Sequence, residues 1–388
     1  MRVVRSQHFS DRNMSFEAIF NHYSWEHVGE QIASCSEADI QRVLRRGRAS
    51  SLGEFAALLS PKASDCLEAL ASRSQEITRR RFGNVMQLYA PLYVSNECQN
   101  ICTYCGYSFN NQIPRLTLSD DQLIAEAQAV RALGFQHVLL VSGEANKTVG
   151  LDYFLNALEL VKPYFAQVSM EVQPLSTEEY RRLVEAGLYA VLVYQETYNQ
   201  QLYKQVHPKG KKSNFFFRLD TPDRLGQAGV HKIGLGVLLG LSDWRTDAYF
   251  VAAHLMYLRK KYWKTRFSVS FPRLRPAEGV QDMQVATTER DLLQLICAFR
   301  FFDENLELSL STRESAHFRD HAHSLGVTSM SAGSKTEPGG YAVNSKALKQ
   351  FEIDDNRSPA EVQQMLQRFV YEVVWKDWEP VLQGIVGA

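Results

Sequence analysis

Short apolar segments alternate with helical segments about eight times along the middle of this chain. The predicted strands are residues 85–94, 137–142, 168–172, 190–194, 232–239, 267–271, 306–310 and 327–331. Helical patterns lie between them, and two begin with capping boxes, at Ser119 and Ser176. Strands that alternate with helices in this way form a parallel sheet. Eight repeats predict an α/β fold, a closed or partly closed (β/α) barrel.

The chain divides into three predicted regions. Residues 1–83 read as an N-terminal helical region without recognisable chemistry, either a lid or a packing layer. Residues 84–335 hold the predicted barrel. Residues 336–388 form a shorter C-terminal segment expected to pack on the barrel, with a helix at 359–372 and a short apolar stretch at 373–375.

Charge and hydropathy exclude several classes of function. Among 388 residues, Lys and Arg number 43 and so do Asp and Glu, which gives a formal net charge of zero. This balance disfavours broad binding to nucleic acid or to an anionic membrane. No apolar run approaches the roughly 18 residues of a membrane span, and the first residues lack the apolar core of a secretory signal. We therefore expect a cytoplasmic protein that binds neither membrane nor nucleic acid.

Three of the six cysteines crowd into eight residues, as Cys98-x3-Cys102-x2-Cys105. Cys35, Cys66 and Cys297 stand alone and read as small buried apolar side chains. A structural zinc site normally takes four protein ligands, and no cysteine or histidine follows Cys105 at finger-like spacing. A zinc ion with three cysteines and water is possible but less usual. Three thiolates on one loop fit a [4Fe–4S] cluster better, with one iron left open to a substrate or cofactor.

Polar residues follow nearly every predicted strand. In barrels of this kind the loops after the strands carry the chemistry. These loop residues are 96–105, 142–144, 171 and 173, 195 and 196, 234–240, 273 and 275, 311–314 and 331–335. Their convergence on one rim predicts an active site there.

The cysteine spacing, with Tyr104 directly before the last cysteine, resembles the signature of the radical S-adenosylmethionine superfamily. Other segments are similar to the tyrosine lyases of that superfamily. They are PLYVSNEC (91–98), TYCGY (103–107), MEVQP (170–174), VYQETY (193–198), DTPDR (220–224), SFPRLRP (270–276) and LSTRE (310–314). The resemblance runs from about residue 52 to the end and is closest to the branch that serves thiamine biosynthesis. It implies that the predicted barrel is of the radical S-adenosylmethionine type.

The resemblance implies a reaction and its cofactors. They are a [4Fe–4S] cluster and S-adenosyl-L-methionine, which yields 5′-deoxyadenosine and methionine. The substrate is L-tyrosine, whose Cα–Cβ bond breaks to give dehydroglycine (2-iminoacetate) and p-cresol. Dehydroglycine then contributes to the thiazole of thiamine. A thiazole synthase subunit and a flavodoxin- or ferredoxin-type electron donor are the partners that the resemblance implies.

The resemblance also implies roles for single residues. Cys98, Cys102 and Cys105 are the expected cluster ligands. Positions expected to bind S-adenosylmethionine are Tyr104 and Gly236 at the adenine, Ser142, Gly143 and Glu144 at the methionine amino group, Glu196 at the ribose and Arg218 at the methionine carboxylate.

The substrate residues are less sharply defined. Arg313 is the candidate for catalysis and for binding the tyrosine carboxylate, with Arg275 and Arg273 as weaker alternatives. Glu171 and Gln173 face the same rim, with no role assigned. A structural ion pair is an equal alternative for Arg273, Arg275, Glu171 and Glu314. Residues 207–212 (HPKGKK) predict a solvated loop, or less readily a contact to an anion or partner.

Two other functions remain open from the sequence. A hydrogenase-maturation tyrosine lyase starts from the same cleavage, but that family carries further cysteines near its C-terminus. No cysteine follows Cys297 here. A non-enzymatic iron–sulfur carrier would also use three thiolates, but it would leave the polar strand ends unexplained. Production of p-cresol separates the lyases from the carrier.

Overall fold

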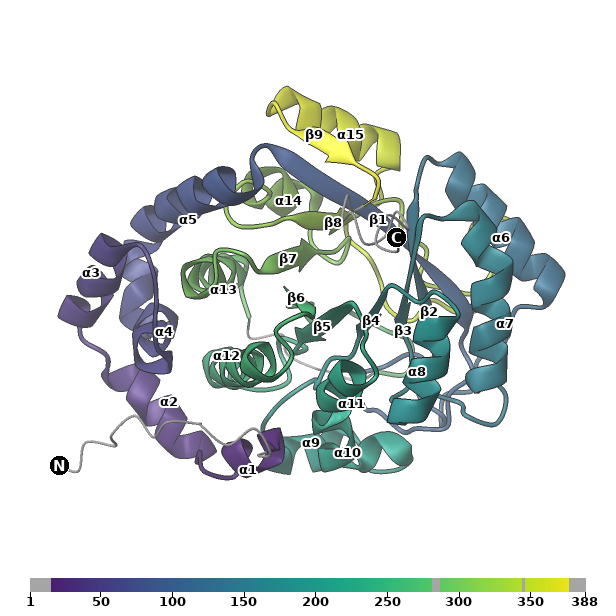
Figure 1. The fold of residues 1–388 in the computed structure, drawn as a ribbon, viewed down its shortest axis with the longest axis horizontal. Helices are drawn as coiled ribbons and strands as arrows, with labels where there is room; N and C mark the ends of the chain where they lie inside the picture. The colour runs from purple at the N-terminus through teal and green to yellow at the C-terminus, as the bar shows by residue number, and fades with distance from the viewer. Residues whose placement is uncertain (1–14, 281–286, 344–345, 377–388) are drawn as a thin grey trace, which may run out of the picture.

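The computed structural model describes residues 15–280, 287–343 and 346–376. Eight parallel strands follow the order β1 to β8, and β1 pairs with both β2 and β8, so the barrel is closed (Figure 1). The strands are β1 (Val85–Ser95), β2 (His137–Ser142), β3 (Gln167–Glu171), β4 (Ala190–Leu192), β5 (Lys232–Gly236), β6 (Arg266–Ser270), β7 (Glu307–Leu310) and β8 (Ser329–Ser331). The predicted (β/α) barrel is confirmed.

Helices connect the strands and cover the outside of the barrel (Figure 1). They are α6 (Asp120–Ala132), α7 (Leu151–Val161), α8 (Thr177–Glu185), α9 (Gln200–Val206), α10 (Phe215–Leu219), α11 (Thr221–Gln227), α12 (Trp244–Lys261), α13 (Glu289–Phe302) and α14 (Ala316–Ala322). Short 3-10 helices η2 (Lys162–Tyr164) and η3 (Lys211–Ser213) add to them. The capping boxes predicted at Ser119 and Ser176 are both formed. None of the helices in the described ranges is long and apolar enough to cross a membrane.

The N-terminal helices lie on the outer side of α12 and α13, as Figure 1 shows. They are α1 (Phe16–Phe20), α2 (Trp25–Ser34), α3 (Glu37–Arg46), α4 (Leu52–Leu59), η1 (Pro61–Cys66) and α5 (Leu67–Phe82). Phe55 packs against Phe299 of α13, with ring centroids 4.8 Å apart. Phe16 stacks on His254 of α12 at 3.7 Å. These contacts make α1–α5 a packing layer; residues 1–14 lie outside the described part.

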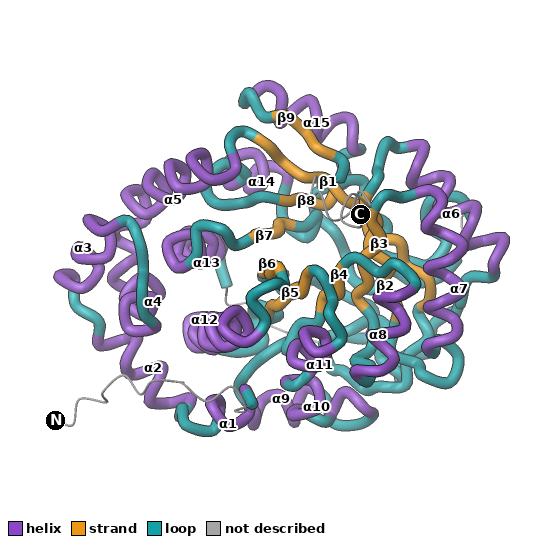
Figure 2. The backbone as a smooth tube through the Cα atoms, viewed as in Figure 1, coloured by secondary structure: helices purple, strands orange, loops and turns teal. Residues whose placement is uncertain are grey.

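The C-terminal segment adds a strand that the sequence pattern did not predict. Helix α15 (Pro359–Arg368) leads into β9 (Glu372–Val374), which pairs in parallel with Val85–Gln87 of β1 (Figure 2). Val373 and Val374 of the predicted apolar stretch are thus part of the sheet, and Trp375 follows it. A run of three strand residues is too short to be recognised without its partner. The limits of the three regions stay a prediction, and residues 377–388 lie outside the described part.

Between β8 and α15 the chain passes close to the cysteine loop. Gly106 N donates to the carbonyl of Gln350 at 3.3 Å, and Asp354 N donates to the carbonyl of Thr312 at 3.0 Å. The carboxylate of Glu126 accepts hydrogen bonds from the backbone N–H groups of residues 341–343. Residues that follow the last barrel strand in sequence therefore lie at the rim of the barrel.

Candidate active site

The three clustered cysteines lie on the loop after β1, at the carboxyl end of the barrel. Arg115 donates to the carbonyl oxygens of Asn96, at 2.6 Å, and Tyr107, at 2.9 Å. The Asn96 side chain accepts from Leu116 N at 2.7 Å and donates to the Pro114 carbonyl at 2.8 Å. These two side chains fix the loop, and the sequence pattern gave them no role. Asn96 stands two residues before Cys98, which was a usable signal.

Cys98, Cys102 and Cys105 line one cavity together with Ser142, Gly143, Glu144, Glu196 and Arg218, which we call the cysteine cavity. The loop residues at the ends of β1, β2 and β4 thus meet, as predicted. Gly236 does not line this cavity; it ends β5 and packs below Tyr194, whose Cδ1 atom would lie 2.8 Å from a Cβ there. The absence of a side chain at position 236 allows this close packing.

The thiols suit a cluster by chemistry. Burial raises the pKa of all three thiols. A coordinated metal deprotonates such a thiol outright. Gln350 Nε2 lies 3.8 Å from Cys105 Sγ as a donor. In the described part of the chain, no three His, Cys, Asp or Glu side chains converge as ligands of a single ion. A cube of four irons instead binds each thiolate at a separate iron, so the donor set fits it.

Gly143 lets the end of β2 pass directly beneath the cysteine loop. Its N–H donates to the Ser95 carbonyl at 3.0 Å. A Cβ at this position would overlap the backbone carbonyl oxygen of Glu97. The adjacent Ser142 is buried, and its Oγ has no hydrogen-bond partner among the described residues. Glycine at 143 is therefore required by backbone packing.

We expect Gly143→Ala to disturb the cysteine loop, because the overlapping atom is backbone and cannot rotate away. Overpacking of this kind costs about 1–3 kcal/mol. Iron content after anaerobic purification and the rate of p-cresol formation should both fall at least about fivefold. Gly53→Ala is the matched control, since the nearest atom to its Cβ would be 3.9 Å away. Full iron content in Gly143→Ala would show that position 143 tolerates a side chain and would contradict this prediction.

Four charged side chains form a buried network on the other wall of the cysteine cavity. Glu144 Oε1 pairs with Arg218 Nη1 at 2.8 Å, and Glu196 Oε1 pairs with Lys212 Nζ at 2.7 Å. Arg218 Nη2 also lies 3.5 Å from Glu196. Burial by itself raises the pKa of both carboxyls, but Arg218 and Lys212 outweigh it, so each pKa lies below its ordinary value. Both carboxylates are thus charged, and Glu144 Oε2 also accepts from Asn100 Nδ2 at 2.8 Å.

The loop at 207–212 is solvated in part, as Pro208, Lys209 and Lys211 are exposed. His207 is fully buried, and Lys212 is buried within the charged network. His207 Nδ1 lies 2.9 Å from the Tyr203 carbonyl, so Nδ1 carries the proton and Nε2 accepts from the Tyr104 hydroxyl at 2.7 Å. Burial lowers the pKa of His207 to about 2, which keeps it neutral. The prediction of a solvated loop was wrong for His207 and Lys212, because charge composition does not reveal which carboxylates will face a lysine.

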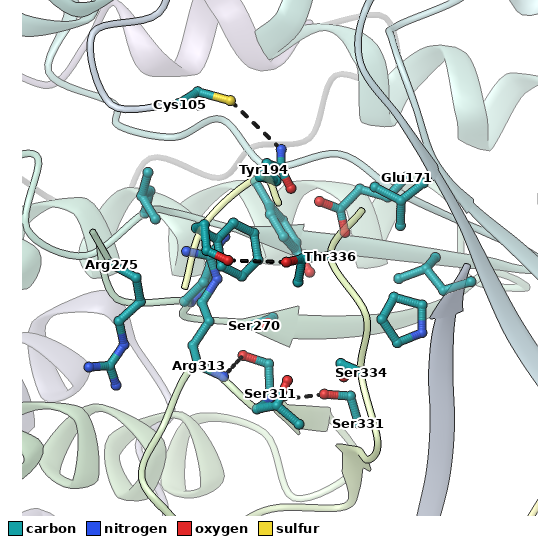
Figure 3. Close-up of a pocket in the computed structure, with 18 of the residues that line it drawn as sticks. Cys105, Glu171, Tyr194, Ser270, Arg275, Ser311, Arg313, Ser331, Ser334 and Thr336 are labelled. Carbon is teal, nitrogen blue, oxygen red and sulfur yellow. Dashed lines mark hydrogen bonds between the residues drawn. The ribbon is translucent and has the colours of Figure 1, made fainter. Parts of the chain in front are cut away.

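A second cavity adjoins the first across the barrel mouth. This aromatic cavity is lined by Tyr89, Tyr93, Tyr104, Tyr194, Glu171 and Arg313, with several serines (Figure 3). Glu171, Tyr194, Glu196, Lys212 and Gln350 line both cavities. A ligand in one cavity therefore lies next to a ligand in the other.

The arginines predicted for the substrate differ in their partners. Arg273 pairs with Glu314 through Nε at 2.9 Å and also through Nη2. Arg275 pairs with Glu314 at 3.2 Å and Asp354 at 3.6 Å, and in Figure 3 its guanidinium points away from Glu171. Arg313 lies over the Phe351 ring, 3.3 Å from its centroid, and donates to the Arg273 carbonyl at 3.3 Å. Among these three, Arg313 alone has no carboxylate partner in the described residues.

Gln173 does not face the rim. Its Nε2 donates to the Val149 carbonyl at 2.6 Å, and its side chain is buried. It therefore anchors the loop between β2 and α7. This leaves Glu171 as the polar residue that β3 contributes to the cavities.

Comparisons with known proteins agree with this geometry. The profile of the Radical SAM superfamily matches residues 92–250, and that of the Biotin and Thiamin Synthesis associated domain matches residues 270–372. The chain is 50% identical to 2-iminoacetate synthase of Salmonella typhimurium strain LT2, over 92% of this chain and 94% of that protein. It is 48% identical to 2-iminoacetate synthase of Escherichia coli strain K12, over 96% of this chain and 97% of that protein.

Solved structures show the same barrel. The hydrogenase maturase HydG from Carboxydothermus hydrogenoformans aligns with a TM-score of 0.87 at 29% identity, covering 94% of this chain and 86% of that one. Methylornithine synthase aligns with a TM-score of 0.70 at 19% identity, covering 87% of this chain and 97% of that one, and supports the fold alone. The lower identity to HydG makes the hydrogenase-maturation alternative the weaker fit. The chain belongs to the 2-iminoacetate synthase family, the radical S-adenosylmethionine lyases of thiamine biosynthesis.

Proposed function

We propose that this chain cleaves the Cα–Cβ bond of L-tyrosine to 2-iminoacetate and p-cresol, with the cofactor in the cysteine cavity and tyrosine in the aromatic cavity. The observation that carries the proposal is the shared wall of the two cavities. A radical reaction needs its source and its substrate in direct contact, because positioning supplies much of the rate. Adjoining cavities provide that contact.

The cysteine cavity offers groups of the right chemistry for both cofactors. Cys98, Cys102 and Cys105 would hold a [4Fe–4S] cluster. When bound, the cluster and S-adenosylmethionine supply the electron and the radical that begin the cleavage. Charged Glu144 and Glu196 would accept hydrogen bonds from the methionine amino group and the ribose. Arg218 would bind the methionine carboxylate, which requires it to share its guanidinium between that ligand and Glu144.

The remaining cofactor residues have narrower roles. The unpartnered Ser142 hydroxyl lies beside the cysteine loop and is free to bind the amino-acid part of the cofactor. Tyr104 lines the aromatic cavity and not the cysteine cavity, so the adenine would meet its ring where the two cavities adjoin. The hydrogen bond to His207 orients this ring. Gly236 lines neither cavity, so its contact with the adenine stays a prediction.

The aromatic cavity offers groups that suit tyrosine. Tyr89, Tyr93 and Tyr194 provide faces for a phenol ring. The buried Ser334 hydroxyl also lines this cavity, and its Oγ has no partner among the described residues, so it is a candidate for the phenol hydroxyl. Arg313 would bind the α-carboxylate through its planar fork. Arg275 is the weaker candidate, because its guanidinium already has two carboxylate partners.

The segment after β8 would exclude water from the aromatic cavity. Phe351 lies against Arg313, and Gln350 reaches Cys105 and the hydroxyl of Tyr93, at 2.8 Å. Both residues line the aromatic cavity. A covered cavity protects a carbon radical from solvent and strengthens electrostatic contacts within it.

The cellular compartment and the partner proteins are also part of the proposal. The six cysteines are free, which suits the reducing cytoplasm. A low-potential donor such as flavodoxin or ferredoxin would reduce the cluster, and a thiazole synthase would take the unstable 2-iminoacetate. Both partners are those that the family resemblance implies.

Anaerobic incubation with S-adenosylmethionine, tyrosine and dithionite tests the function. We expect p-cresol and 5′-deoxyadenosine to form in step, together with glyoxylate from hydrolysis of 2-iminoacetate. Tryptophan offered in place of tyrosine should give no cleavage product, because the cavity is built around a phenol. Absence of p-cresol from protein with a full cluster would refute the proposal and favour an iron–sulfur carrier.

A further inference from the structure

Glu171 is a carboxylate without a partner at the junction of the two cavities. It ends β3 and lines both of them. Its backbone pairs with Val141 of β2, but its side chain makes no hydrogen bond and no ion pair with any other residue in the described part of the chain. Glu144 and Glu196, the other carboxylates on these walls, each pair with a cation. Glu171 is only partly exposed, and a charge in such a cavity wall is normally paired, so the missing partner points to a ligand.

Arg313 is the matching cation. It reaches the aromatic cavity from the loop after β7, and its described contacts are a ring face and a backbone carbonyl, not a carboxylate. Figure 3 shows Glu171 and Arg313 on different sides of this cavity. An unpaired anion and an unpaired cation on one cavity are complementary to a zwitterion.

We propose that Glu171 binds the α-ammonium group of the substrate while Arg313 binds its α-carboxylate. This inference rests on the proposed function, since it assumes an amino-acid substrate in the aromatic cavity. The pair fixes both charged groups on Cα and leaves the phenol side chain among the tyrosine rings. The Cα–Cβ bond is then held between two anchored ends, which suits a reaction that breaks it.

The environment of Glu171 agrees with this role. Burial and the nearby Glu196 raise its pKa to about 7, although Arg313 lowers it. An ammonium group nearby would restore the charged form and would itself be stabilised. The amino group of S-adenosylmethionine is the other possible cation. The cysteine cavity already offers it Glu144, whose charged state Arg218 secures.

The test is equilibrium binding to the reconstituted holoenzyme, anaerobic and without reductant, so that no turnover occurs. Wild type and Glu171→Gln are titrated with tyrosine, with 3-(4-hydroxyphenyl)propionate, which lacks the amino group, and with S-adenosylmethionine. Glutamine keeps the shape and removes the charge. Glu68→Gln, exposed at the start of α5, is the matched control. Circular dichroism and cluster absorbance check that each variant is folded and loaded.

We expect Glu171→Gln to weaken tyrosine binding roughly 30-fold or more, as loss of a buried ion pair does. Binding of 3-(4-hydroxyphenyl)propionate and of S-adenosylmethionine should stay within about threefold of wild type. Equal loss for both phenols, unchanged tyrosine binding, or a loss confined to S-adenosylmethionine would each overturn the inference. If wild type itself neither binds tyrosine nor forms p-cresol, the proposed function fails instead.

Discussion

Cys102→Ala is expected to abolish the iron–sulfur absorbance of anaerobically purified protein and to reduce p-cresol formation to background. Cys102 is buried beneath Tyr104 and Leu238, and the Ser108 hydroxyl accepts from its backbone N–H at 3.0 Å. Alanine leaves this loop geometry in place and removes one of three thiolates. A cluster with two protein ligands is not retained, so the loss should be complete. Ultraviolet–visible and paramagnetic resonance spectra report the cluster directly.

Cys66→Ala is the matched control, because Cys66 lies at the end of η1 in the N-terminal layer, outside both cavities. It should keep the wild-type iron content and activity. A four-iron spectrum in Cys102→Ala would disprove the ligand set. If the wild type held stoichiometric zinc and took up no iron after reconstitution, the three cysteines would form a zinc site, and the lyase proposal would fail.

Arg313→Gln is expected to raise the KM for tyrosine by about 100-fold or more. Truncating one side of a buried, hydrogen-bonded charge pair costs about 2–5 kcal/mol, and 1.4 kcal/mol is a factor of ten. The effect should depend on the ligand. Wild type should bind tyrosine far more tightly than tyramine, which lacks the carboxylate, and Arg313→Gln should bind the two about equally. The rate of p-cresol formation gives the KM for tyrosine and, with tyramine added, the inhibition constant for tyramine. These two values are compared in each variant.

Arg275→Gln provides the comparison for this prediction. Its guanidinium pairs with Glu314 and Asp354, so the change should affect stability more than the preference for tyrosine over tyramine. If Arg275→Gln removes that preference while Arg313→Gln keeps it, the carboxylate site belongs to Arg275. Together with Glu171→Gln, these variants separate the two ends of the bound zwitterion.

Much of the fold could be predicted because its signals are local. Alternation of short apolar runs with helices depends on residues within one element, and Ser119 and Ser176 mark helix starts by contacts three residues away. The number of such units predicts a closed or partly closed barrel. Full closure is seen only in the structure, where β1 pairs with both β2 and β8. Strand β9 has no local signal of this kind, since its three residues are a strand only beside β1.

The cysteine ligands could also be predicted from the sequence, because Cys98, Cys102 and Cys105 are close together in the chain and their chemistry is specific. Glu144, Glu196 and Arg218 were expected at the same rim because each follows a strand or belongs to a motif. Their mutual pairing was not predicted. It depends on side chains 22 to 74 positions apart that only the closed barrel brings within 3.5 Å.

The sequence by itself determined the barrel, the trio of thiols and the rim on which the chemistry lies, because periodicity and spacing act over a few residues. Only the tertiary structure decided which charges are paired. It paired Lys212 with Glu196 and both Arg273 and Arg275 with Glu314. It left the side chains of Glu171 and Arg313 without a partner of opposite charge among the described residues. Ion pairing depends on distances between loops from different strands, and those distances exist only once the barrel has closed.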